Sequence, residues 1–222
     1  MLIIGHRGCN LEPENTLRAL AKGMECADFV EVDVRMSKDG VPVIIHDRTL
    51  ERTTNGKGLV KELTLKQLKE LDAGKGEKIP TLQEVLDLIK DRGLLVEIKE
   101  TGTEGKICDM IKESGVRNIM LVSFNPGSLR TAKEMLPDIK TGIIYSRIVE
   151  NPLRLALGIK ANILLPKYEL ASRELVEISH RRNLMVFPWT LNTDHEIRNA
   201  VDIEVDGFAT DNPCFAKQLL SI

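Results

Sequence analysis

Two predicted strands in the first half of this sequence carry ionisable side chains two residues apart. Glu31 and Asp33 form one pair, and Glu97 and Lys99 form the other. Residues i and i+2 of a β-strand point to the same side, so the members of each pair would face one way. Burying such charges is costly unless they are paired or bind a cation. Carboxylate oxygens without thiolates favour one hard divalent cation, Mg²⁺ or Ca²⁺, with Glu31, Asp33 and Glu97 as its ligands.

The alternative is that these carboxylates face covering helices and form salt bridges. Helix-facing positions of parallel strands are usually apolar, which makes the metal interpretation the stronger one for Glu31 and Asp33.

Two of the four histidines, His6 and His46, follow predicted strands and have cationic groups nearby. One histidine at a strand end is often structural, but two beside Arg7 and Lys99 indicate a reactive site. The imidazoles are candidates for a general acid and a general base, in an order that the sequence leaves open. Arg7 offers a bidentate guanidinium to a phosphate or carboxylate, and Lys99 offers a point charge. Together with a hard metal, these groups favour phosphoryl chemistry.

The elements that would position these residues alternate along the chain. Short runs rich in β-branched residues predict strands at 2–5, 29–35, 42–46, 94–99, 119–123, 141–145, 162–165, 185–189 and 205–209. Amphipathic patterns predict helices at 14–27, 82–91, 103–114, 126–136, 151–158, 172–182, 193–201 and 212–220. About eight strand–helix units favour an α/β fold, a single closed (β/α)8 TIM barrel, whose active site would lie at the carboxyl ends of the strands. A doubly wound open sheet is the alternative, but no GxGxxG or GxxxxGK[ST] motif follows a predicted strand.

Residues 47–79 interrupt this alternation. They contain a turn-rich loop at 53–58 and an amphipathic stretch at 64–71, with leucines at 63, 65, 68 and 71 that favour packing over disorder. A long connection within a compact domain usually has a function. We expect a small insertion after the second β segment, over one face of a single domain that spans residues 1–222.

Composition and charge argue against several classes of protein. The 31 Lys and Arg residues nearly balance the 33 Asp and Glu residues, so bulk charge does not favour nucleic acid. The longest stretch without a charged residue has 12 residues, whereas a membrane-spanning helix needs about 18, which predicts no stable membrane insertion. The apolar run at 2–4 is too short for a signal peptide. Four widely spaced cysteines, Cys9, Cys26, Cys108 and Cys214, predict no disulfide framework and no structural zinc, and with that a reducing, cytoplasmic location.

Short motifs are spread from residue 4 to about residue 213. In chain order they are His6-Arg7-Gly8, Pro13-Glu14-Asn15-Thr16, Glu31-x-Asp33, His46-Asp47, Pro80-Thr81-Leu82-x-Glu84, Glu97-Ile98-Lys99, Trp189-Thr190-x-Asn192 and Asp206-Gly207-Phe208-x-Thr210-Asp211. As a set they resemble the glycerophosphodiester phosphodiesterase family. The resemblance implies a TIM-barrel enzyme that hydrolyses glycerophosphodiesters, its small-molecule substrates, to glycerol phosphate and an alcohol. It also implies that residues 47–79 are the family's characteristic insertion.

The resemblance implies roles for particular residues: catalytic histidines at His6 and His46, metal ligands at Glu31, Asp33 and Glu97, and phosphate contacts at Arg7 and Lys99. Phe124 and Trp189 are either core residues or an apolar wall for the glycerol or the leaving group. Glu14 is as well suited to a helix start as to the site. Asp211 is expected to cap the last helix.

Other functions stay open at this point. A lysophospholipase D activity fits if the mouth of the barrel admits an acyl chain. A cyclising phosphodiesterase on the same barrel is a second alternative, against which the insertion argues. A non-catalytic barrel that binds a phosphorylated ligand is less favoured, because all seven ionisable groups are present. The sequence does not distinguish direct attack by water from a cyclic intermediate, nor a monomer from a homo-oligomer.

Overall fold

Eight parallel strands form the centre of the molecule. The computed structural model describes residues 1–220, and its parallel strands are β1 (Leu2–Gly5), β2 (Phe29–Met36), β4 (Gly93–Ile98), β5 (Ile119–Ser123), β6 (Lys140–Tyr145), β7 (Ile163–Pro166), β8 (Met185–Val186) and β9 (Gly207–Thr210). They pair in the order β8-β7-β6-β5-β4-β2-β1-β9. The first strand of the chain therefore lies between the second and the last, as a barrel requires.

The ring closes between β8 and β9 through backbone hydrogen bonds. The amide of Asp206 donates to Val186 O at 3.2 Å, that of Ala209 donates to Pro188 O at 3.0 Å, and that of Leu191 donates to Ala209 O at 2.9 Å. The strand predicted at 185–189 is shorter than expected, because Pro188 has no amide hydrogen to donate. The predicted (β/α)8 TIM barrel is confirmed, and the open-sheet alternative is wrong.

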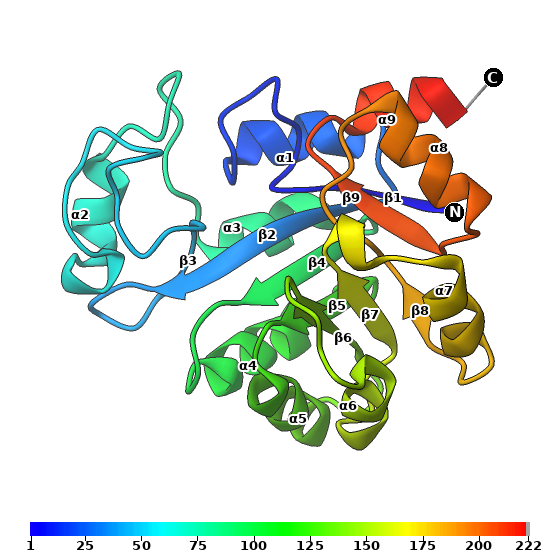
Figure 1. Cartoon of the computed structure of the whole chain (residues 1–222). Helices are drawn as coiled ribbons and strands as arrows, with labels where there is room; N and C mark the ends of the chain where they lie inside the picture. The colour runs from blue at the N-terminus through cyan, green and yellow to red at the C-terminus, as the bar shows by residue number, and fades with distance from the viewer. Residues whose placement is uncertain (221–222) are drawn as a thin grey trace.

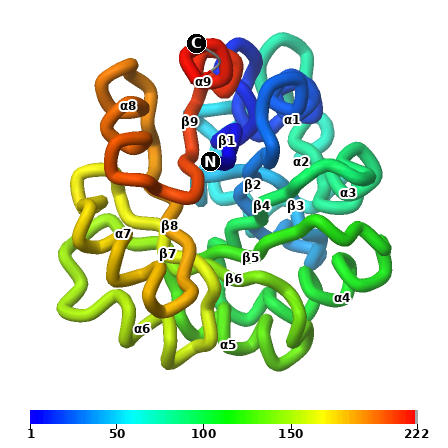
Figure 2. The backbone as a smooth tube through the Cα atoms, turned by 90° about the vertical axis from the view of Figure 1, so that its right-hand side faces the viewer, coloured from blue at the N-terminus to red at the C-terminus, as the bar shows by residue number. Residues whose placement is uncertain are grey.

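Helices surround the ring of strands, as Figure 2 shows. They are α1 (Leu17–Met24), α3 (Leu82–Ile89), α4 (Glu104–Ser114), α5 (Pro126–Met135), α6 (Pro152–Gly158), α7 (Arg173–His180), α8 (Asp194–Asp202) and α9 (Pro213–Leu220), with a 3-10 turn at Tyr168–Leu170 before α7. Helix α1 begins three residues later than predicted, because Thr16 accepts a hydrogen bond from Ala19 N and caps it, and Asn15 has a φ of 58°. Among residues 1–220, none of the helices has the length and apolar character needed to span a bilayer.

Residues 47–79 form the expected insertion, which lies to one side of the barrel beside β3 (Pro42–Ile44), as Figure 1 shows. Strand β3 pairs antiparallel with β2 and leads into a 3-10 turn (Val60–Glu62) and helix α2 (Leu65–Glu70). The insertion packs around its own apolar cluster, which includes Leu50, Val60 and Leu68. The leucines at 63, 65 and 71 pack against this cluster, so the segment is ordered by burial as the sequence predicted.

Alternation along β2 and β4 determines which side chains enter the barrel. Val96 on β4 packs with the cluster beneath the helices, whereas its neighbour Leu95 packs inside the barrel with Phe29 and Val122. Glu97 is two residues beyond Leu95 and therefore faces the lumen. Strands β2 and β4 thus place their carboxylates inside the barrel and their valines against the helices.

A disulfide joins Cys26, just after α1, to Cys214 in α9, across 188 residues of sequence. The prediction that the cysteines form no disulfide is wrong, because linear spacing does not show that barrel closure brings the first and last helices together. Cys9 and Cys108 are buried and free. The cytoplasmic location inferred from the cysteines loses this support and stays a prediction.

Candidate active site

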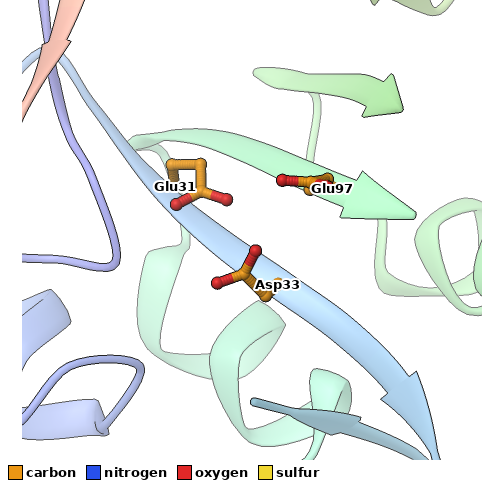
Figure 3. Close-up of side chains that lie close together, drawn as sticks. All are labelled: Glu31, Asp33 and Glu97. Carbon is orange, nitrogen blue, oxygen red and sulfur yellow. The ribbon is translucent and has the colours of Figure 1, made fainter. Parts of the chain in front are cut away.

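Three carboxylates from β2 and β4 converge, Glu31 and Asp33 from along β2 and Glu97 from near the end of β4, as Figure 3 shows. Glu31, Asp33 and Glu97 are all buried, and each offers an oxygen within 4.8 Å of the other two. The register explains the arrangement, since Asp33 and Glu97 are directly paired across the two strands and Glu31 lies two residues before Asp33. We call these three residues the acidic triad.

Two cations neutralise part of this charge. The Nζ atom of Lys99 lies 2.8 Å from Asp33 Oδ1 and 2.7 Å from Glu97 Oε1. Arg7 Nε lies 3.2 Å from Asp33 Oδ2, and the backbone amide of Arg7 donates to Glu31 Oε2 at 2.9 Å. Three carboxylates therefore face two cationic side chains in a buried space.

The pKa values of the acidic triad follow from this balance. Burial raises the pKa of Glu31 well above its usual range, and the charges of Asp33 and Glu97 add to the effect. Burial also raises the pKa of Glu97 to about 7, against the opposing charge of Lys99. Burial would raise the pKa of Asp33 as well, but Lys99 and Arg7 outweigh it and hold that pKa below its usual range. The acidic triad thus offers oxygen ligands whose negative charge exceeds the positive charge of the two neighbouring cations. Such a site fits a hard divalent cation.

His6 is held by residues from the far end of the chain. It follows β1, and its Nδ1 lies 2.7 Å from Asp211 Oδ1, just after β9. Because a carboxylate only accepts hydrogen bonds, Nδ1 is the donor and Nε2 is left for a ligand. Asn192 donates to the other oxygen of Asp211 at 2.6 Å. Asp211 does not cap α9 as predicted, since Asn212 accepts the hydrogen bond from Phe215 N instead.

His46 is held by its neighbour in the sequence. Its Nδ1 lies 2.6 Å from Asp47 Oδ1, so this ring also presents Nε2. The backbone carbonyl of His46 accepts a hydrogen bond from Arg35 Nε at 2.8 Å. Burial lowers the pKa of His46, while the carboxylates of Asp33 and Asp47 act in the opposite direction.

Arg52 ties the insertion to the site. It contacts Asp47 Oδ2 at 2.5 Å and both oxygens of Glu14 at 2.7 and 2.8 Å. Glu14 also accepts a hydrogen bond from Arg7 Nη1 at 2.9 Å. Glu14 is therefore a member of the site and not of a helix. These contacts form a continuous ionic network from His46 through Asp47 to Arg7.

The side chains surround one hollow of about 90 Å³, which we call the barrel hollow. Its polar side consists of His6, Arg7, Glu31, His46, Glu97 and Lys99. Its apolar side includes Phe124 and Trp189, whose rings meet edge to face with centroids 5.8 Å apart, together with apolar barrel residues. A larger hollow of about 610 Å³ lies near the amino ends of β5 and β6, away from these groups.

All nine predicted site residues thus meet in one place: eight line the barrel hollow, and Asp33 lies behind it in contact with Arg7 and Lys99. Their roles stay predictions. Three contributors were not expected from the residues alone, namely Asp211, Asn192 and Asn15. Asn15 donates to Asp33 Oδ2 at 2.8 Å and accepts from Asp33 N. The motifs contain these residues, but Asn15 lies at a predicted helix start and Asp211 was expected to cap the last helix.

The fold and the site together define a TIM-barrel enzyme equipped for phosphoryl chemistry. The model of the glycerophosphoryl diester phosphodiesterase family matches residues 6–214, and the chain belongs to this family. A glycerophosphodiester phosphodiesterase of Caldanaerobacter subterraneus is 42% identical, over 96% of this chain and 94% of that protein. One of Bacillus altitudinis is 33% identical, over 95% of this chain and 94% of that protein.

A solved structure gives a further comparison. An Oleispira antarctica phosphodiesterase in complex with the product sn-glycerol-3-phosphate superposes with a TM-score of 0.92 at 29% identity, over 100% of this chain and 97% of that one. A relative with the same barrel therefore binds a small phosphorylated product.

Proposed function

We propose that this protein hydrolyses glycerophosphodiesters to glycerol phosphate and an alcohol, with a divalent cation and two histidines. The observation that carries the proposal is the pair of imidazoles, each held at Nδ1 by a carboxylate, at one hollow with the acidic triad. The family and the product complex of the relative support the substrate class. Mg²⁺ and Ca²⁺ both take such oxygen ligands.

Glu31, Asp33 and Glu97 would hold the cation, which would supply charge to offset that of the phosphate oxygens. Arg7 and Lys99 would contact the phosphate from the polar side of the hollow. One imidazole would take a proton from the attacking hydroxyl, and the other would give a proton to the departing oxygen. Phe124 and Trp189 would form the apolar wall against the glycerol.

We further propose that residues 47–79 border the leaving group. The insertion begins directly after His46, and Arg52 fixes it to Asp47 and Glu14. A leaving group on this side of the phosphate would therefore contact the insertion.

The test uses the purified full chain, treated with a chelator and then given Mg²⁺ or Ca²⁺. The substrates are glycerophosphodiesters with different alcohols and one lysophospholipid, and ³¹P NMR identifies the products. We expect glycerol phosphate from the glycerophosphodiesters only when a cation is present. A lasting cyclic phosphate would favour the cyclising enzyme, and preferred cleavage of the lysophospholipid would favour lysophospholipase D.

The metal assignment has its own variants. Glu31→Gln combined with Asp33→Asn should abolish the metal-dependent rate and weaken binding of the cation in calorimetry. Glu62→Gln, at an exposed acid in the insertion, is the matched control and should change neither. Unchanged rate and metal dependence in the first variant would exclude these ligands.

A further inference from the structure

A second hollow, of about 640 Å³, adjoins the candidate active site on the side of the insertion. Arg48, Leu59 and Lys61 of the insertion line one side of it, and Thr101 and Asn125, in the loops after β4 and β5, line the other. We call this space the insertion cleft. Lys99 lines both the insertion cleft and the barrel hollow, so the two spaces meet at this residue.

The charges of the insertion cleft are not balanced. Its one acid, Glu100, accepts hydrogen bonds from Arg35 Nη1 at 3.0 Å and from Met36 N at 3.3 Å. Within residues 1–220, Arg48 and Lys61 have no side-chain hydrogen bond and no carboxylate within ion-pair distance, and both are exposed. Two cations therefore face the cleft without a partner.

A neighbouring arginine, Arg52, provides a comparison for the unpaired cations of the insertion cleft. Arg52, four residues after Arg48, has both Asp47 and Glu14 as partners. Acids to pair with are therefore at hand in this part of the chain, yet within residues 1–220 none of them pairs with Arg48 or Lys61, and both side chains are free to bind an anionic group.

The sizes of the two spaces assign them to different parts of a substrate. The barrel hollow, of about 90 Å³, has an apolar wall and room for a group on the scale of glycerol. The phosphate would lie by Arg7 and Lys99, at the junction. The alcohol on the other side of the phosphate must then extend out of the barrel hollow. The insertion cleft is the larger space that begins at Lys99.

On this basis, and resting on the proposed function, we propose that the insertion cleft is the leaving-group subsite. Arg48 and Lys61 select glycerophosphodiesters whose alcohol carries a negative charge, as a phosphate or a carboxylate. At a separation of about 4 Å in water, each cation should favour an anionic alcohol about fivefold.

The experiment compares two substrates that differ in one group: glycerophosphoglycerol, and glycerophosphoglycerol with a phosphate on its terminal hydroxyl. We measure kcat and KM for both with the full wild-type chain, Arg48→Gln with Lys61→Gln, each single variant, and Lys66→Gln. Lys66 is an exposed cation on α2 that has no ionic partner among the described residues 1–220 and does not line the cleft, so it controls for loss of surface charge. Circular dichroism checks that every variant is folded.

Wild type should prefer the phosphorylated substrate in kcat/KM, mainly through a lower KM. Each single variant should reduce the preference about fivefold and the double variant about 25-fold, if the effects add. Lys66→Gln should leave it unchanged. The preference should shrink as salt concentration rises.

Several results would overturn the subsite. A wild type that hydrolyses both substrates equally well, or a double variant that keeps the wild-type preference, would contradict the proposal. A double variant that slows both substrates equally would show a general effect on the site. If the same variants lose binding to phosphatidylglycerol vesicles while the substrate preference is unchanged, the cations serve a lipid surface. Hydrolysis of neither substrate would instead overturn the proposed function, on which the subsite rests.

Discussion

His6 and His46 each contact a carboxylate through Nδ1, but the two carboxylates come from different parts of the sequence. The partner of His6 is Asp211, 205 residues away in the sequence, whereas the partner of His46 is the next residue. The first contact exists only because β1 pairs with β9, where Gly5 and Thr210 are in register. The second joins adjacent residues, and Arg52 of the insertion holds the carboxylate in place.

The two sides of the mouth therefore depend on different parts of the fold. The His6 side depends on barrel closure, and the disulfide between Cys26 and Cys214 joins the helices beside the same strands. The His46 side depends on an ionic network at the base of the insertion. The same imidazole–carboxylate contact thus depends on tertiary closure at His6 and on adjacent residues at His46.

The largest expected effect is the loss of either imidazole. His6→Ala and His46→Ala should each lower kcat on an alkyl glycerophosphodiester about 10²- to 10⁴-fold, as for loss of a general acid or base. A nitrophenolate leaving group needs no proton, so it should rescue only the variant that lacks the acid. His195→Ala, at an exposed histidine in α8, is the control and should keep the wild-type rate. Near-normal rates in both His6 and His46 variants would place the acid–base pair elsewhere.

The second effect is on stability and concerns only the His6 side. Replacing Cys26 and Cys214 by serine should lower the free energy of unfolding by about 2–5 kcal/mol, because the bond closes a very long loop. Urea titrations should show that reductant destabilises the wild type to a similar extent and leaves the double variant unchanged. Hydrogen exchange should accelerate in β1 and β9 more than in α2. A wild type that unfolds at the same urea concentration with and without reductant would refute this.

The third effect tests whether the two carboxylates position the imidazoles. Asp211→Asn and Asp47→Asn should each lower kcat about 10- to 100-fold, as expected for a hydrogen bond to a charged group. The carboxylate of Asp47 raises the pKa of His46 against the lowering effect of burial. Its removal should therefore lower that pKa further and move the corresponding limb of the pH–rate profile to lower pH. A reduced rate with an unmoved limb would indicate a purely structural role for Asp47.

The smallest effect belongs to Arg52. Its side chain is 46% exposed, so Arg52→Gln should lower the free energy of unfolding by about 1 kcal/mol or less, and by less still in high salt. A double-mutant cycle with Glu14→Gln isolates the ion pair. Arg130→Gln, at an exposed arginine on α5, controls for the loss of one surface charge. No coupling between Arg52 and Glu14 at low salt would mean that the network does not hold the insertion in place.

Much of the site could be predicted because its spacing is local. The i, i+2 pairs on β2 and β4 needed only the period of a strand to be placed on one face. Thr81 and Glu84 form a capping box at the start of α3, for which a threonine followed three residues later by a glutamate is the typical sequence pattern. Alternating strands and helices predicted parallel strands covered by helices, and the count of about eight units favoured a closed barrel over an open sheet.

The ionisable groups and the strand faces from which they project can therefore be predicted from the sequence. The contacts of Asp211 with His6 and of Cys26 with Cys214 follow only from the three-dimensional structure, because both require the last strand–helix unit to lie against the first. The path of the insertion also places Arg52 beside two acids, whereas Arg48 and Lys61 have no such partner within residues 1–220. Local periodicity acts over a few residues, whereas contacts between the ends of the chain depend on how the whole ring closes.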